Sequence, residues 1–66
     1  MSPQQTSLML KAMRIYGGGF VKALAEAWAR ADNFNEARLV QAFPDYVTQY
    51  GPGSAFYQVI EKREVA

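Results

Sequence analysis

The sequence contains no cysteine and no histidine among its 66 residues. Without cysteine there is no disulfide framework and no thiol nucleophile, so packing alone must stabilise the fold. Without either residue, zinc and most transition metals lack their preferred ligands, and the commonest general base of enzymes is missing. We therefore predict a protein that is not an enzyme and that carries no metal and no cofactor.

Long hydrophobic runs are also missing. Three basic residues interrupt the only candidate for a membrane span, namely Lys11, Arg14 and Lys22. The opening MSPQQTS has neither a basic start nor a long apolar stretch, so it does not read as a secretory signal. Because 50% of the residues are hydrophobic, the chain is too apolar to be disordered. We expect one domain spanning residues 1–66, of marginal stability and located in the cytoplasm.

The most regular pattern in the chain is YGGGFVKALAEAWARAD, from Tyr16 to Asp32. Its apolar side chains recur at i, i+4, i+7, i+8 and i+11, which is one face of an α-helix: Phe20, Leu24, Ala27, Trp28 and Ala31. Alanine at every second position favours a helix and allows a neighbouring helix to approach closely. The only tryptophan, Trp28, should therefore lie at the centre of the core.

Glycine and proline divide the rest of the chain into short helices. The Ser2-x-x-Gln5 spacing is typical of a capping box at the start of a first helix. The residues Gly17-Gly19 predict a corner, because each glycine inside a helix costs about 1 kcal/mol relative to alanine. One long helix whose glycines face a close neighbour is the alternative. Their spacing matches neither a phosphate loop nor a dinucleotide fingerprint.

The second half of the chain contains three further boundaries. Asn33 and Glu36 have the spacing of an N-cap and its partner, so a helix should begin near Asp32-Asn33. A second helical pattern has its apolar face at Leu39, Phe43, Tyr46, Val47 and Tyr50. Pro44 falls inside this pattern and should either kink the helix or break it, and a break is favoured.

After Gly51-Gly53, Ser54 should cap a last helix. Its inward side chains should be Ala55, Phe56, Val59 and Ile60. The sequence thus predicts an all-α fold, a small compact bundle of three to five short helices. The predicted breaks lie near Gly17-Gly19, Asp32-Asn33, Pro44 and Gly51-Gly53.

An excess of aromatic side chains points to a protein partner. One tryptophan, four tyrosines, four phenylalanines and three methionines exceed what so small a core encloses, and the surplus should form an apolar surface patch. The candidate contact residues are Tyr46, Tyr50 and Tyr57, because tyrosine is enriched at interfaces. The alternative is that these rings line the edge of the core with their hydroxyls in water. We expect a protein partner or a homodimer.

Two other kinds of site were weighed. The side chains before Ala25 carry a charge of +3, from Lys11, Arg14 and Lys22, while the remainder carries four bases and six acids. This basic edge on the first helix supports a small DNA-associated regulator as an alternative function. Asp32 and Glu36 could form a catalytic carboxylate pair, but capping a helix accounts for both.

Two segments, IYGGGFVKALAEAWARAD and RLVQAFPDYVTQYGPGSAFY, resemble short uncharacterised proteins encoded in bacteriophages and prophages. The resemblance covers most of the chain and includes no catalytic motif. It implies a phage accessory protein in the cytoplasm of the host cell. Such a protein would act by binding a host or phage protein.

Overall fold

The computed structural model describes residues 1–65, and this part of the chain contains five α-helices and no strand. Their bounds are α1 Pro3–Tyr16, α2 Gly19–Ala29, α3 Asn33–Ala42, α4 Pro44–Tyr50 and α5 Ala55–Val65. The molecule measures 32 × 25 × 18 Å along its principal axes. The predicted all-α bundle of three to five short helices is confirmed.

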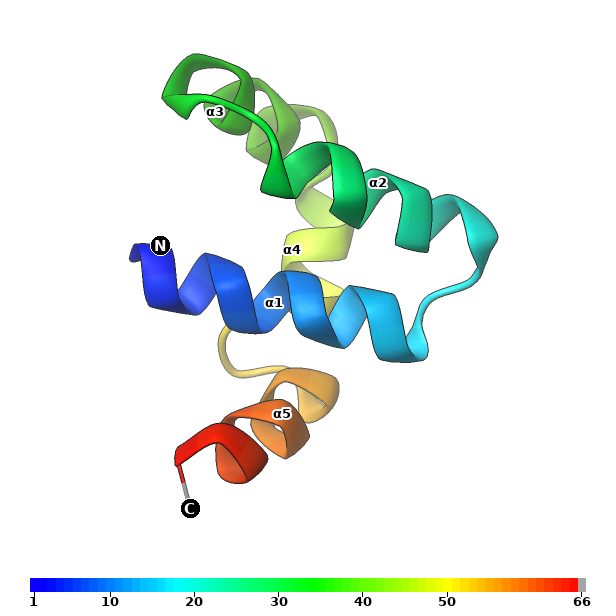
Figure 1. Ribbon diagram of the computed structural model, residues 1–66, viewed down its shortest axis with the longest axis vertical. Coiled ribbons are helices and arrows are strands. Elements are labelled where there is room, and N and C mark those ends of the chain that lie inside the picture. Colours follow the sequence, from blue (N-terminus) through cyan, green and yellow to red (C-terminus); the bar gives the residue numbers. More distant parts are fainter. Residues whose placement is uncertain (66) are drawn as a thin grey trace.

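Helix α1 occupies the middle of the bundle. Figure 1 shows α2 on one side of α1, α5 on the other and α4 behind, and α1 contacts all three helices. Helix α3 lies farther from α1 and packs against α4. Because it has neighbours on several sides, α1 buries an unusually wide arc, made up of Thr6, Leu8, Met9, Leu10, Ala12 and Met13.

The capping box at the start of α1 is present as predicted. The Ser2 hydroxyl accepts a hydrogen bond from the backbone N–H of Gln5 at 3.1 Å, and the Gln5 side chain accepts one from the Ser2 N–H at 2.8 Å. Together these bonds satisfy two donors that a helix terminus otherwise leaves without a partner. They fix the start of the helix that the rest of the bundle surrounds.

The corner between α1 and α2 confirms the predicted break and excludes one long helix. Helix α1 ends at Tyr16, and α2 begins at Gly19. A side chain at Gly17 would collide with Val21 and with the Met13 carbonyl, whereas one at Gly18 or Gly19 would meet nothing. The close approach of α1 and α2 at their junction therefore depends on the first glycine of the three.

The boundaries of α3 and α4 also lie where the sequence placed them, with one correction. Asp32, and not Asn33, is the N-cap of α3, and its carboxylate accepts a hydrogen bond from the Asn35 N–H at 2.8 Å. A carboxylate at this position faces the positive end of the helix dipole, which favours it as a cap. Pro44 breaks the helix and becomes the first residue of α4.

Helix α5 follows the predicted glycine turn. Gly53 adopts φ +90°, a conformation that side chains disfavour, and the Ser54 hydroxyl accepts a hydrogen bond from the Tyr57 N–H at 3.2 Å. On α5, Ile60 is buried and Phe56 is half-buried as expected, but Val59 is 40% exposed, Ala55 is also exposed, and Tyr57 is buried instead. The helix is rotated so that Tyr57 faces its neighbours.

Trp28 lies in the core as predicted, with only 1% of its surface exposed. The predicted apolar face of α2 is wrong at Phe20, which is 62% exposed, and at Ala27, which is also exposed. The buried residues of this helix are Val21, Ala25 and Trp28. Because its alanine residues make several faces of α2 apolar, the sequence pattern does not determine which face is buried. Contact with α1 determines it. Of the helices in residues 1–65, none combines the length and hydropathy that a membrane span requires.

Candidate protein-interaction surface

Six aromatic rings form a connected series across the bundle, which we call the aromatic row. Neighbouring ring centroids in the row are 4.5 to 6.3 Å apart, within the range of favourable aromatic contacts. The rings come from α1, α2, α4, α5 and the junction of α3 with α4. In order along the row they are Phe20, Phe43, Tyr46, Tyr50, Phe56 and Tyr16.

The row is buried in its middle and exposed at its ends. Tyr50 is only 4% exposed, and it contacts the half-buried rings of Tyr46 and Phe56. Phe20 is 62% exposed at one end, and Tyr16 is 37% exposed at the other. The row therefore joins the core to the surface.

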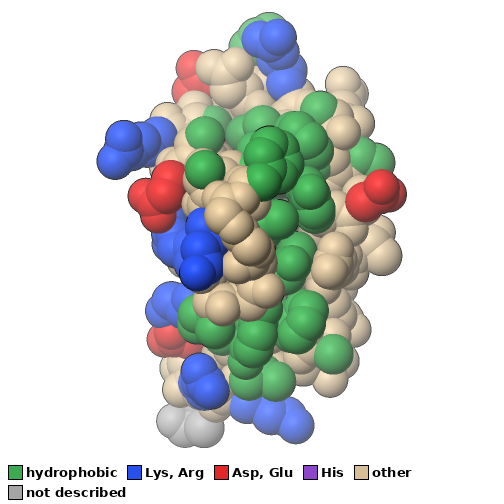
Figure 2. All heavy atoms as spheres, turned by 90° about the vertical axis from the view of Figure 1, so that its right-hand side faces the viewer, with side chains coloured by type: hydrophobic (Ala, Val, Ile, Leu, Met, Phe, Trp, Pro, Cys, Tyr) green, Lys and Arg blue, Asp and Glu red, His purple; other side chains and the backbone are tan. Residues whose placement is uncertain are grey.

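Hydrophobic side chains gather on the face of the molecule that carries the corner between α1 and α2. This corner lies at the right of Figure 1, and Figure 2 views the same side directly. Figure 2 shows a hydrophobic band running along the molecule, with most charged groups toward the margins. An apolar centre with a charged edge is the usual anatomy of a protein interface.

The three predicted contact tyrosines do not share one environment. Tyr46 is half-buried within the row, and its ring lies 6.3 Å from that of Phe20. Tyr50 and Tyr57 are each 4% exposed, so the expectation that Tyr50 and Tyr57 offer their rings at the surface is wrong. Burial raises the pKa of Tyr57, and the Glu61 carboxylate raises it further. Both buried tyrosines belong to the core.

The basic residues of the alternative function lie beside acids. The Lys11 ammonium pairs with the Glu64 carboxylate, and the Arg14 Nε lies 2.8 Å from the Glu26 Oε1. These pairs are solvent-exposed, so each contributes little to stability. They nevertheless neutralise the basic edge of α1. Lys22 is exposed on α2.

The two carboxylates weighed as a catalytic pair have different roles. Asp32 caps α3, whereas Glu36 lies in the first turn of that helix beyond the cap. Within the described residues, no group of three or more acidic side chains, cysteines or histidines could hold a metal ion. Asp32 therefore has a structural role at the start of α3.

Sequence reasoning missed the two exposed ends of the aromatic row. Phe20 was predicted to lie on the apolar, core-facing side of its helix. Their contacts join residues far apart in the chain, such as Tyr16 and Phe56, whose rings stack at 4.5 Å. The sequence carries one signal of the row, because Phe43, Tyr46 and Tyr50 recur at helical spacing.

Comparisons of the chain with protein-family models, with curated proteins and with solved structures found no match. The resemblance to phage proteins therefore remains a prediction.

Proposed function

We propose that this chain is a small, non-enzymatic interaction module that pairs with a second copy of itself through the aromatic row. The observation that carries the proposal is the position of Phe20. Its ring is 62% exposed, yet it contacts Phe43 and Tyr46 within the row. A large exposed ring supported by half-buried rings is the kind of anchor that dominates binding energy at interfaces.

A second copy suits this face for reasons of charge and symmetry. The net charge is +1, so two copies repel each other weakly. In a two-fold dimer each copy contributes the same patch, and aromatic rings can pack against their own symmetry mates. Arg14 and Glu26 form an ion pair, so neither adds an unbalanced charge.

The size of the molecule is compatible with such a dimer. Its accessible surface is 4299 Å². A standard interface buries about 800 Å² on each partner, which is about a fifth of that surface. The apolar band would supply the centre of the contact, and polar groups around it would supply the edge. A marginally stable small domain gains stability when association covers its exposed apolar groups.

The resemblance to phage proteins suggests a setting for this module. We place it in the cytoplasm of a bacterial host, as a phage accessory protein. A host or phage protein with a complementary apolar surface would compete with the second copy for the aromatic row. The phage setting and the cytoplasmic location both belong to the proposal.

Equilibrium sedimentation of two variants tests the dimer. Phe20→Glu places a charge at the exposed end of the row and should weaken the dimer by at least tenfold. Phe34→Glu is the matched control, because Phe34 is 70% exposed on α3 and outside the row. It should leave association unchanged. Circular dichroism should show native helical content in both variants.

Two outcomes would contradict the proposal. The first is a wild-type chain that remains monomeric throughout the concentration range of the sedimentation experiment. The second is equal weakening by Phe20→Glu and Phe34→Glu, since the contact would then not be specific to the row.

The alternative function as a DNA-associated regulator needs its own experiment. An electrophoretic shift with duplex DNA at low salt should detect binding through Lys11, Arg14 and Lys22. If the basic edge binds phosphates, alanine at Lys11 and Arg14 should weaken the complex and flatten its salt dependence. The ion pairs of Lys11 and Arg14 with Glu64 and Glu26 lead us to expect no shift.

A further inference from the structure

A second candidate site is a groove of about 540 Å³ between the C-terminal end of α2 and one face of α3. Its volume lies within the range typical of ligand pockets, about 300–1,000 Å³. The apolar part of the lining consists of Ala27, Ala31, Leu39 and Ala42. Three of these four residues are alanines, and their short side chains leave the space between the two helices unfilled.

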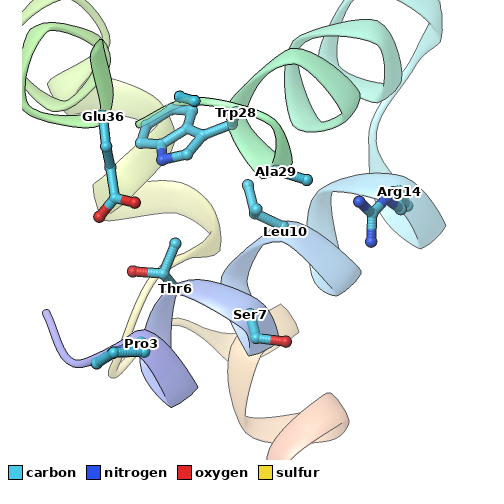
Figure 3. A pocket seen from close by; sticks show the side chains of 9 residues that line it. Pro3, Thr6, Ser7, Leu10, Arg14, Trp28, Ala29 and Glu36 are labelled. Carbon is cyan, nitrogen blue, oxygen red and sulfur yellow. The ribbon is translucent and has the colours of Figure 1, made fainter. Parts of the chain in front are cut away.

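The charged side chains that line the groove are two arginines, and no acid lines it within the described residues. In residues 1–65, neither Arg30 nor Arg38 forms an ion pair. The Asp32 carboxylate, which is close in sequence, caps α3. Glu36 lines a separate pocket of about 270 Å³, and Figure 3 shows its carboxylate turned toward Thr6 of α1. The lining of the groove therefore carries two positive charges and no negative one.

Arg38 is held in place before any ligand binds. Its guanidinium carbon lies 5.6 Å from the centroid of the Phe34 ring, which is close enough for a cation–π interaction. Its Nη1 donates a hydrogen bond to the Asn35 Oδ1 at 3.4 Å. A guanidinium has five N–H donors, so most of them remain to bind an acceptor. An arginine that is already positioned loses less side-chain freedom when a ligand binds.

The two arginines and the apolar lining together define the ligand. Guanidinium groups bind carboxylates through two parallel hydrogen bonds, and the alanine and leucine side chains favour an apolar group beside that carboxylate. We propose that this groove binds an acidic segment of a partner protein, in which carboxylate side chains neighbour apolar ones. Two arginines neutralise too few phosphates to bind nucleic acid strongly, and a phosphate backbone has no apolar group to place against the alanines.

This inference is separate from self-association through the aromatic row. Of the six rings in that row, none lines the groove in the part of the chain that the structure describes. The module would then have an apolar face for a second copy and a basic groove for an acidic partner. Different variants test the two surfaces, so failure of one proposal is distinguishable from failure of the other.

Titration of the ¹⁵N-labelled 66-residue chain, followed by heteronuclear NMR, measures binding and locates it. The probe is a hexapeptide of alternating leucine and glutamate with blocked ends. The backbone amide resonances of Asn35, Arg38 and Leu39 should shift in a saturable manner. A matched hexapeptide with glutamine in place of glutamate should bind at least tenfold more weakly, because it has no carboxylate. Equal binding of the two probes, or no shift with either, would overturn the proposal.

Two variants test the arginines. Arg30→Gln and Arg38→Gln each remove one charge, and both side chains are exposed, so the fold should be retained. Each variant should weaken binding of the glutamate peptide by roughly tenfold, as expected for lost hydrogen bonds to a charged group. Arg63→Gln is the matched control, because Arg63 is exposed on α5 and does not line the groove. Equal weakening by all three changes would mean a general effect of charge, and the proposal would fail.

Two further measurements address the other possible occupants of the groove. A short DNA duplex, added under the same conditions, should leave the groove resonances unmoved. If they shift with DNA and not with the peptide, the groove binds phosphates and the proposal is wrong. Equilibrium sedimentation of Arg30→Gln and Arg38→Gln should show the same association as the wild type. If either change abolishes association, a second copy occupies the groove, which also contradicts the proposal.

Discussion

Helices α1 and α3 show how differently two elements of one small bundle contribute to it. Helix α1 buries six residues and contacts α2, α4 and α5. Helix α3 is described throughout its length and has no buried residue. It contributes only half-buried contacts to the core, from Leu39 and Val40. Both helices nevertheless begin with a side-chain cap, at Ser2 and Asp32.

The difference shows that two kinds of interaction stabilise helices in this protein. Burial between several neighbours stabilises α1, and its free-energy contribution grows with the apolar area removed from water. Helix α3 has fewer such contacts, so its cap and its short connections to α2 and α4 account for more of its stability. Helices with few buried contacts open locally at lower free energy than the core.

The largest expected effect is on the free energy of unfolding when one apolar side chain in each helix is truncated to alanine. Met13 is fully buried in α1, and Met13→Ala should lower the free energy of unfolding by about 2–5 kcal/mol. Leu39 in α3 is half-buried, and Leu39→Ala should cost less than half as much. Urea denaturation followed by circular dichroism measures both. Equal losses would mean that α3 is as firmly packed as α1.

A smaller effect is expected at the caps. Asp32→Ala should lower the free energy of unfolding by about 1 kcal/mol, because the Asn35 N–H loses its acceptor. Native-state hydrogen exchange should show faster exchange in α3 and unchanged protection in α1. Ser2→Ala is the matched change at α1. If Asp32→Ala accelerated exchange equally in all helices, α3 would not open independently.

The smallest expected effect is a pH dependence of stability that arises from Tyr57 on α5, the helix on the other side of α1. The pKa of Tyr57 is raised above its ordinary value of 10.0, first by burial and then by Glu61. A raised pKa means that the folded protein holds this proton more tightly than the unfolded chain. The contribution of Tyr57 to the free energy of unfolding is therefore complete below pH 10, and it is lost as the pH rises through the pKa of Tyr57 in the folded protein.

Thermal melts between pH 8 and pH 11 measure this loss. The melting temperature of the wild type should fall more steeply above pH 10 than that of Tyr57→Phe, which has no phenol to ionise. Tyr46→Phe is a useful control, because Tyr46 is only half-buried. Identical slopes in the wild type and Tyr57→Phe would show that ionisation of Tyr57 does not affect folding.

The helices and their boundaries were predictable because local chemistry determines them. The capping box at Ser2, the glycine corner and the break at Pro44 depend on residues within one or two turns of each other. The cap of α3 was predicted one residue too late, since Asp32 and Asn33 are both good caps. Only the structure distinguishes between such neighbours.

The orientation of each helix was less predictable, because it depends on packing between helices. Phe20 and Val21 are both apolar, and contact with α1 decides which of them is buried. The same reasoning applies to Tyr57 and Val59 on α5.

The three consecutive glycines form the most uniform stretch of the sequence, yet they are not equivalent in space. Only the first lies where a methyl group would collide with its neighbours, and the other two have open space around them. Natural variation at the second and third positions should therefore be tolerated, while the first should resist replacement. A designer who copied this hairpin could keep Gly17 alone and use alanine at the other two positions.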